Sequence, residues 1–160
     1  MARHIWSVFC EKSIIAQDGR VSMLNCIEAA QIKLSAEDAE KFEKSQVPLT
    51  IPQENTLVSL WVRENRETPE VATCRMFFRD PNGKILRKKG DIEINLRESV
   101  RGRVTMYSRD WVLSEAGEHP TSGEYCIEIQ QQRKSTGGRI RWRTEASIPV
   151  VISMEFTSPS

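Results

Sequence analysis

The chain has 160 residues, a length typical of one domain and sufficient to bury its own core. Its formal net charge of +1 gives no global field that would draw it to nucleic acid or an anionic membrane. No apolar run approaches the roughly 20 residues of a membrane span, and the N-terminus lacks a signal-peptide pattern. We therefore expect one cytosolic domain over residues 1–156, a disordered tail at 157–160 and no membrane association.

The first elements along the chain look like a β-hairpin. Two apolar runs, at 3–15 and 20–32, flank Asp18-Gly19, which is a strong hairpin signal. The first run is apolar on both faces, which indicates a central or covered strand. A three-residue loop would place Cys10 opposite Cys26, whereas a two-residue turn would put them on opposite faces. The sequence leaves both alternatives open.

A change of pattern then marks the one helix that we predict. Ser35 and Asp38 form a capping box at the start of residues 36–44, where Phe42 would pin a short surface helix. Lys84 to Gly90 is interpreted as a basic turn region. Strand-like alternation occupies the stretches around it, at 56–64, 71–79, 92–96 and 104–112.

Period-two alternation is strongest in the stretch that closes the chain. A hairpin that pairs Ile129 with Trp142 would set Glu128 opposite Arg143 as an oppositely charged cross-strand pair. Pro149 cannot donate to a strand ladder, so we expect it at a sheet edge, a strand start or a bulge. Together the elements predict an all-β fold, an antiparallel β-sandwich (immunoglobulin-like or related) of about eight strands with one short α-helix.

Six short motifs are spread along the chain: Val8-Phe-Cys-Glu11, Gln17 to Asn25, the bend from Val47-Pro48 to Ile51-Pro52, Phe77 to Gly83, Gly123-Glu-Tyr125 and Ile148-Pro149-Val150. In this order they resemble the motifs of an uncharacterised family of small bacterial β-sandwich proteins. The resemblance covers nearly the whole chain and implies a bacterial β-sandwich, with no established activity to carry over.

The candidate ligand-binding residues are Arg139, Arg141, Arg143 and Trp111. The three arginines alternate along one strand and so share one face, while Trp111 follows a polar stretch and precedes a long loop. Residues 87–89 form a second basic cluster. Such arginines could bind phosphate or a nucleic-acid backbone, but we favour an exposed face on which they pair with glutamates across the strands.

Other chemistry has less support in the sequence. Cys126 and His119 are a candidate nucleophile and base, although no protease or hydrolase signature surrounds them. The four cysteines lack zinc-site spacing, and no calcium-loop spacing is present. We expect no metal and no cofactor.

The function that we expect is that of a non-enzymatic cytosolic binding or scaffold module acting through a protein partner. A homo-oligomer is left open, and nucleic acid is not an expected partner. The first alternative is a ligand-binding β-sandwich for glycan or nucleotide that uses Trp111 with the arginines at 139, 141 and 143. The second is a small hydrolase that uses Cys126 and His119.

Overall fold

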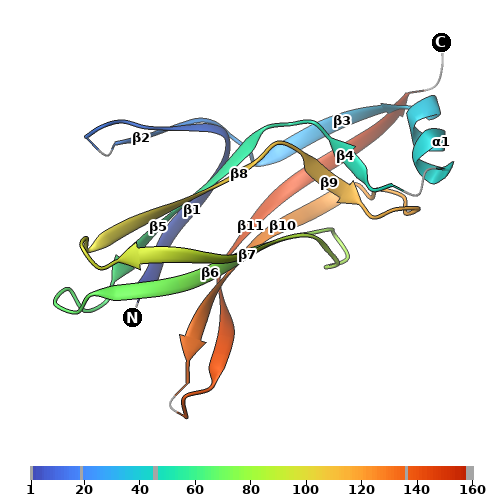
Figure 1. The fold of residues 1–160 in the computed structure, drawn as a ribbon. Coiled ribbons are helices and arrows are strands. Elements are labelled where there is room, and N and C mark those ends of the chain that lie inside the picture. Colours follow the sequence, from blue (N-terminus) through green and yellow to red (C-terminus); the bar gives the residue numbers. More distant parts are fainter. Residues whose placement is uncertain (1, 19, 45–46, 136, 158–160) are drawn as a thin grey trace.

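The structure, a computed structural model, describes residues 2–18, 20–44, 47–135 and 137–157 (Figure 1). Within these ranges the helix α1 is too short and polar to cross a membrane. The elements in chain order are β1 (Ala2–Ile15), β2 (Val21–Cys26), β3 (Ala29–Ser35), α1 (Ala36–Lys44), β4 (Leu49–Ile51), β5 (Asn55–Arg63), β6 (Glu70–Arg79), β7 (Ile85–Leu96), β8 (Arg101–Ser108), β9 (Trp111–Ser114), β10 (Gly123–Lys134) and β11 (Ile140–Thr157).

Two main sheets form the body of the protein. One has the strand order β2-β1-β5-β8 and the other β3-β11-β10-β6-β7, while β4 and β9 pair separately. The all-β prediction is therefore confirmed. The prediction of about eight antiparallel strands is wrong in detail, because the described residues form eleven strands and β3 runs parallel to β11.

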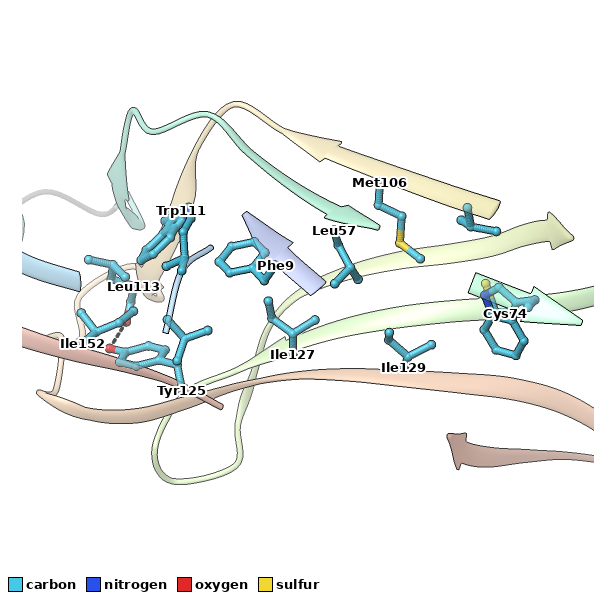
Figure 2. Close-up of a cluster of buried hydrophobic side chains, with 14 of the residues drawn as sticks. Phe9, Leu57, Cys74, Met106, Trp111, Leu113, Tyr125, Ile127, Ile129 and Ile152 are labelled. Atoms are coloured by element: carbon cyan, nitrogen blue, oxygen red, sulfur yellow. Dashed lines mark hydrogen bonds between the residues drawn. The ribbon is translucent and has the colours of Figure 1, made fainter. Parts of the chain in front are cut away.

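The core lies between the two sheets, as Figure 2 shows. Along β10 the side chains of Tyr125, Ile127 and Ile129 are buried, and the residues between them are more exposed. They face Phe9 of β1 and Leu57 of β5 across the gap between the sheets. The alternation in the sequence thus identified the core-facing side of β10, because successive strand residues point to opposite faces.

The stretch predicted as one strand at 20–32 is in fact two strands in different sheets. Asn25 has a φ of 51°, in the left-handed region, and the chain leaves β1 after this point to enter the second sheet as β3. Cys10 pairs with Cys26 in register, so the three-residue loop was the right alternative. Both cysteines are free thiols.

The closing hairpin has a different register from the predicted one. Ile129 lies opposite Ala146 and Gln130 opposite Thr144, so Glu145 is an extra residue that forms a β-bulge. From Thr144 back to the turn, each β11 side chain therefore lies on the face opposite to the predicted one. Glu128 consequently lies opposite Ser147 and not Arg143.

Other local predictions agree with the structure. Residues 36–44 form α1, and Phe42 packs against the core. Pro149 lies where β11 has a neighbour only on the β10 side, since its pairing with β3 begins at Val151. β11 continues through Thr157, and residues 158–160 of the predicted tail lie outside the described residues.

Candidate functional site: a cavity between the sheets

The first half of β7 carries two cations on its core-facing side. The sequence predicted a basic turn at 84–90, but β7 begins at Ile85 and pairs with β6. In this register Lys89 lies opposite Met76 and Arg87 opposite Phe78, two residues that pack against the core. Directly opposed residues of an antiparallel pair share a face. Arg87 and Lys89 therefore point between the sheets.

A bulge in β7 decides which basic residues turn inward. Between the pairs Cys74–Ile92 and Met76–Lys89, β7 has two residues, Gly90 and Asp91, where β6 has one. Asp91 has a φ of 31°, an uncommon conformation for a residue other than glycine. Without this extra residue the register would shift by one, and the faces of the basic residues would be exchanged.

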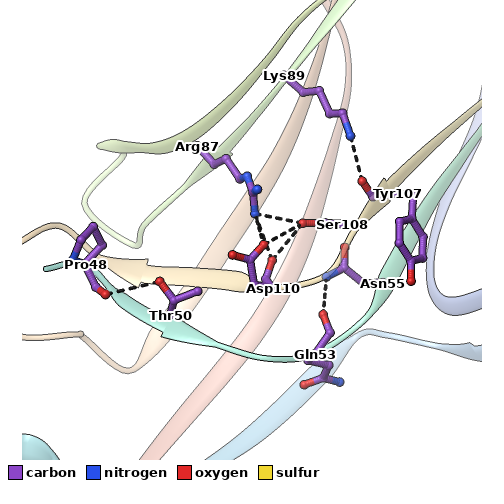
Figure 3. A network of polar contacts seen from close by, with 9 residues as sticks. All are labelled: Pro48, Thr50, Gln53, Asn55, Arg87, Lys89, Tyr107, Ser108 and Asp110. Atoms are coloured by element: carbon purple, nitrogen blue, oxygen red, sulfur yellow. Dashed lines mark hydrogen bonds and ion pairs between the residues drawn. The ribbon is translucent and has the colours of Figure 1, made fainter.

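The two inward-facing cations reach across to the opposite sheet, as Figure 3 shows. The Arg87 guanidinium donates to Asp110 Oδ1 at 2.5 Å and to Ser108 Oγ at 2.9 Å. The Lys89 ammonium donates to the backbone carbonyl of Tyr107 at 2.8 Å. These bonds connect β7 to the end of β8 and the start of β9, and they close one open side of the sandwich.

Behind the cations lies a cavity of about 210 Å³ between the sheets. Its walls are mainly aromatic and aliphatic side chains. Arg87, Lys89 and Asp110 also line it and are at least partly exposed, so we call their end of the cavity its mouth. The apolar residues that line it are Phe9, Leu57, Met76, Phe78, Met106, Trp111, Val112 and Ile127. An apolar cavity of about 150 Å³ can hold a benzene ring. This cavity therefore has room for a small apolar group.

Trp111, one of the residues singled out in the sequence, lines this cavity. Its side chain is buried, and its ring centroid lies 5.7 Å from that of Phe9. Within the described ranges the indole Nε1 is buried and has no hydrogen-bond acceptor. Trp61, Arg63 and Gln131 also carry such an unpaired buried atom, but only Trp111 of the four lines the cavity. A buried donor without a partner costs about 1–3 kcal/mol, which an acceptor on a ligand would offset.

The mouth of the cavity has a positive charge that the protein does not fully neutralise. Arg87 has Asp110 as its counter-ion, whereas the acceptor of Lys89 is a neutral carbonyl. No carboxylate in the described part of the chain forms an ion pair with Lys89. At the outer rim the interaction of the exposed Tyr107 hydroxyl with the Glu54 carboxylate raises the pKa of Tyr107. A ligand with an acidic group would find Lys89 at the boundary between the cavity and water.

The structure does not bring the predicted ligand-binding residues together. Arg139, Arg141 and Arg143 are all exposed at the turn end of the β10–β11 hairpin. Trp111 is in β9, well away from that turn, as Figure 1 shows. The cations that accompany Trp111 come instead from the second basic cluster. The sequence contained that cluster, but only the bulge at Gly90 and Asp91 reveals which members face inward.

The structure places the two candidate hydrolase residues on different elements. Cys126 is half-buried and lies opposite Pro149 and Arg79, on the side of β10 that faces away from the core. His119 is exposed in the loop before β10. The described residues contain no group of three or more His, Cys, Asp or Glu side chains arranged to hold a metal ion.

A hydrogen-bonded chain of side chains at the other end of the core was not predicted. His4 Nε2 lies 2.7 Å from Ser7 Oγ, which lies 2.7 Å from the fully buried Ser59 Oγ. Burial lowers the pKa of His4, although the Glu145 carboxylate acts in the opposite direction. The ring centroids of His4 and Trp61 lie 5.0 Å apart in a T-shaped arrangement. None of these residues lines the cavity, and we interpret the chain as one that satisfies polar groups inside the core.

Comparison of the sequence with models of known protein families and with curated proteins finds no match. The case for a function therefore depends on the geometry of this chain.

Proposed function

We propose that this protein is a non-enzymatic binding module that holds a small amphipathic anion between its two sheets. The observation that carries the proposal is the pair of inward-facing cations, Arg87 and Lys89, at the mouth of an apolar cavity. A sandwich core that served only stability would place apolar residues at these positions, as β7 does at Ile92, Ile94 and Leu96. Departures of this kind from the hydrophobic pattern are typical of functional sites.

The chemistry of the cavity indicates an alkyl or aryl carboxylate. Its walls would take a chain of roughly six to eight carbons or one ring, judged from the cavity volumes that hold benzene. The carboxylate would lie near Lys89, whose ammonium is bound only to a carbonyl oxygen. Charge-assisted bonds of this kind are about twice as strong as neutral ones.

A glycan or a nucleotide suits this site less well than an alkyl or aryl acid. Glycans are polar on most sides and need hydrogen-bonding partners, whereas this cavity is mostly apolar. The Trp111 ring is buried at 4% exposure and gives no open stacking platform. The protein partner, the cytosolic location, the bacterial source and an immunoglobulin-like relationship stay predictions from the sequence.

A calorimetric titration with carboxylates of increasing length tests the proposal. Burying each added methylene contributes about 0.8 kcal/mol to the binding free energy, so affinity should rise about fourfold per carbon from butanoate to octanoate. Octan-1-ol, which has the same chain without the charge, should bind more weakly than octanoate. Absence of saturable binding by any of these carboxylates would refute the proposal.

A matched pair of variants separates the site from general charge effects. Lys89→Met should remove the preference for octanoate over octan-1-ol. Lys88→Met is the control: Lys88 is among the residues that line the cavity, but its ammonium lies over the Phe77 ring on the opposite face of the sheet. If both variants lost octanoate equally, or neither did, Lys89 would not be the group that holds the anion.

A further inference from the structure

The turn end of the β10–β11 hairpin projects from the sandwich as a two-stranded ribbon. β6 pairs with β10 only as far as Gln131, and β3 pairs with β11 only from Val151. The described residues 132–135 and 137–144, which we call the arm, therefore have no neighbouring strand outside the hairpin in the described structure. Figure 1 shows this hairpin extending away from the other strands.

One face of the arm gathers arginines that repel one another. Arg141 lies directly opposite Arg133, and Arg143 lies on the same face opposite Gln131. Arg139 follows the turn, immediately before β11. Like charges placed directly opposite each other across two strands destabilise the pairing. A ribbon that served only structure would not gain from this arrangement.

The carboxylate that reaches this face, among the residues described, is that of Glu145 at the bulge. It accepts from Arg133 Nε at 3.0 Å and Nη2 at 2.8 Å, and it lies 3.9 Å from Arg143 Nε. Its charge is thus committed mainly to Arg133. The Arg143 side chain remains 69% exposed, and Arg139 and Arg141 are also exposed. Three guanidinium groups are left to face solvent.

The opposite face of the arm is tied to the body of the protein. The Arg75 guanidinium stacks on the Trp142 ring at 4.0 Å and donates to Gln130 Oε1 at 2.6 and 2.9 Å. This contact fixes the base of the arm. The arginine-bearing face is therefore presented to a partner from a held ribbon, which lowers the entropic cost of binding.

From this arrangement we infer that the arm binds double-stranded DNA, entering the major groove with its arginines on the phosphates. A two-stranded ribbon fits the major groove of B-DNA, which is about 12 Å wide. The planar guanidinium matches phosphate in a two-bond geometry, and the three exposed cations on this face, Arg139, Arg141 and Arg143, are all arginines. An acidic protein surface would contact only one face of the arm. The major groove of DNA, in contrast, can enclose both faces of a ribbon that projects away from the body of the protein, as the arm does.

The register explains why the sequence argued against nucleic acid. The predicted hairpin set Glu128 opposite Arg143, so the arginines appeared to be neutralised. In the structure Glu128 binds Arg79 of β6 at 2.7 Å and lies on the sheet below the arm. The near-zero net charge of the whole chain then restricts DNA contact to the arm and does not prevent it.

Fluorescence anisotropy with a labelled 20-base-pair duplex of mixed sequence tests this inference. For about three phosphate contacts, the logarithm of the association constant should fall with the logarithm of salt concentration with a slope near −3. R141Q/R143Q should weaken binding at least tenfold and reduce that slope by about 2. R101Q/R103Q removes the same charge from exposed positions on β8 and should change the affinity less than about twofold.

Further measurements distinguish duplex DNA from other partners of the arm. No duplex binding at low salt, equal losses in the two double variants, or tighter binding of a single strand or a poly-glutamate peptide would each overturn it. R141Q/R143Q removes a pair of like charges that face each other, so its melting temperature should not fall. A loss of DNA binding at an unchanged melting temperature would therefore not be due to unfolding. Octanoate binding should be the same in both double variants, which separates this test from that of the cavity.

Discussion

Tyr125 offers the sharpest test of how β10 is fixed against the loop that precedes it. Its side chain is fully buried, and the one hydrogen of its hydroxyl is shared between two acceptors, the carbonyl oxygens of Thr121 at 2.9 Å and Leu113 at 3.2 Å from the hydroxyl oxygen. Burial raises the pKa of Tyr125 to about 12, so the hydroxyl stays protonated and remains a donor throughout the ordinary pH range. Tyr125→Phe deletes the donor and keeps the ring, which stacks on Phe78 at 5.5 Å.

The expected loss follows from the carbonyl groups that remain. Leaving a buried acceptor without its donor costs about 1–3 kcal/mol, and we take about 2 kcal/mol for this site. For a chain of this size each kcal/mol lowers Tm by about 2–4 °C, so Tm should fall by about 4–8 °C. Urea unfolding should show a lower midpoint with an unchanged slope, because the surface exposed on unfolding is the same.

The only other tyrosine supplies the control. Tyr107 is 44% exposed, so Tyr107→Phe should change the free energy of unfolding by less than about 0.5 kcal/mol. If Tyr125→Phe were equally silent, the two carbonyl bonds would contribute nothing to stability. The account of how β9 and the following loop are held to β10 would then be wrong.

Two further predictions concern the core and the bulge. Because the pKa of His4 is lowered in the fold, the unfolded state binds more protons than the folded state near and below pH 6.5, so stability should fall as the pH drops through about 6.5. His4→Gln should reduce this loss of stability, measured as urea midpoints, and His119→Gln, which removes the other histidine, should retain it. Identical pH profiles for the two variants would contradict the assignment to His4. Asp91→Gly should change the free energy of unfolding by less than about 1 kcal/mol. Asp91→Val should lower it by about 1–3 kcal/mol and weaken octanoate binding, since a β-branched residue is strained at a φ of 31°. Equal stabilities of the two variants would show that the bulge is not strained.

Much of the fold could be predicted from alternation alone. The buried positions of β10, the edge location of Pro149 and the helix at 36–44 follow from local patterns that the structure retains. The parallel pairing of β3 with β11 could not be predicted in this way, because it joins residues more than a hundred positions apart. Nothing in the local pattern of either strand specifies such a partner.

The candidate sites depended on two single-residue bulges. The extra residue at Glu145 reverses the faces of Arg141, Trp142 and Arg143, and the one at Gly90–Asp91 turns Arg87 and Lys89 inward. A strand shifted by one residue exchanges its two faces completely, so a correct strand prediction can still assign every side chain to the wrong side. The basic clusters were visible in the sequence, but their surroundings were not.

The most direct measurement of the central claim is NMR of methyl-labelled methionine during titration with octanoate. Of the five methionines, Met76 and Met106 line the cavity, whereas Met23 and Met154 do not. If the anion enters between the sheets, the ε-methyl signals of Met76 and Met106 should shift and saturate together, and those of Met23 and Met154 should stay in place. Shifts confined to Met23 or Met154, or no saturable shift at Met76 and Met106, would contradict the proposal that the cavity is the binding site.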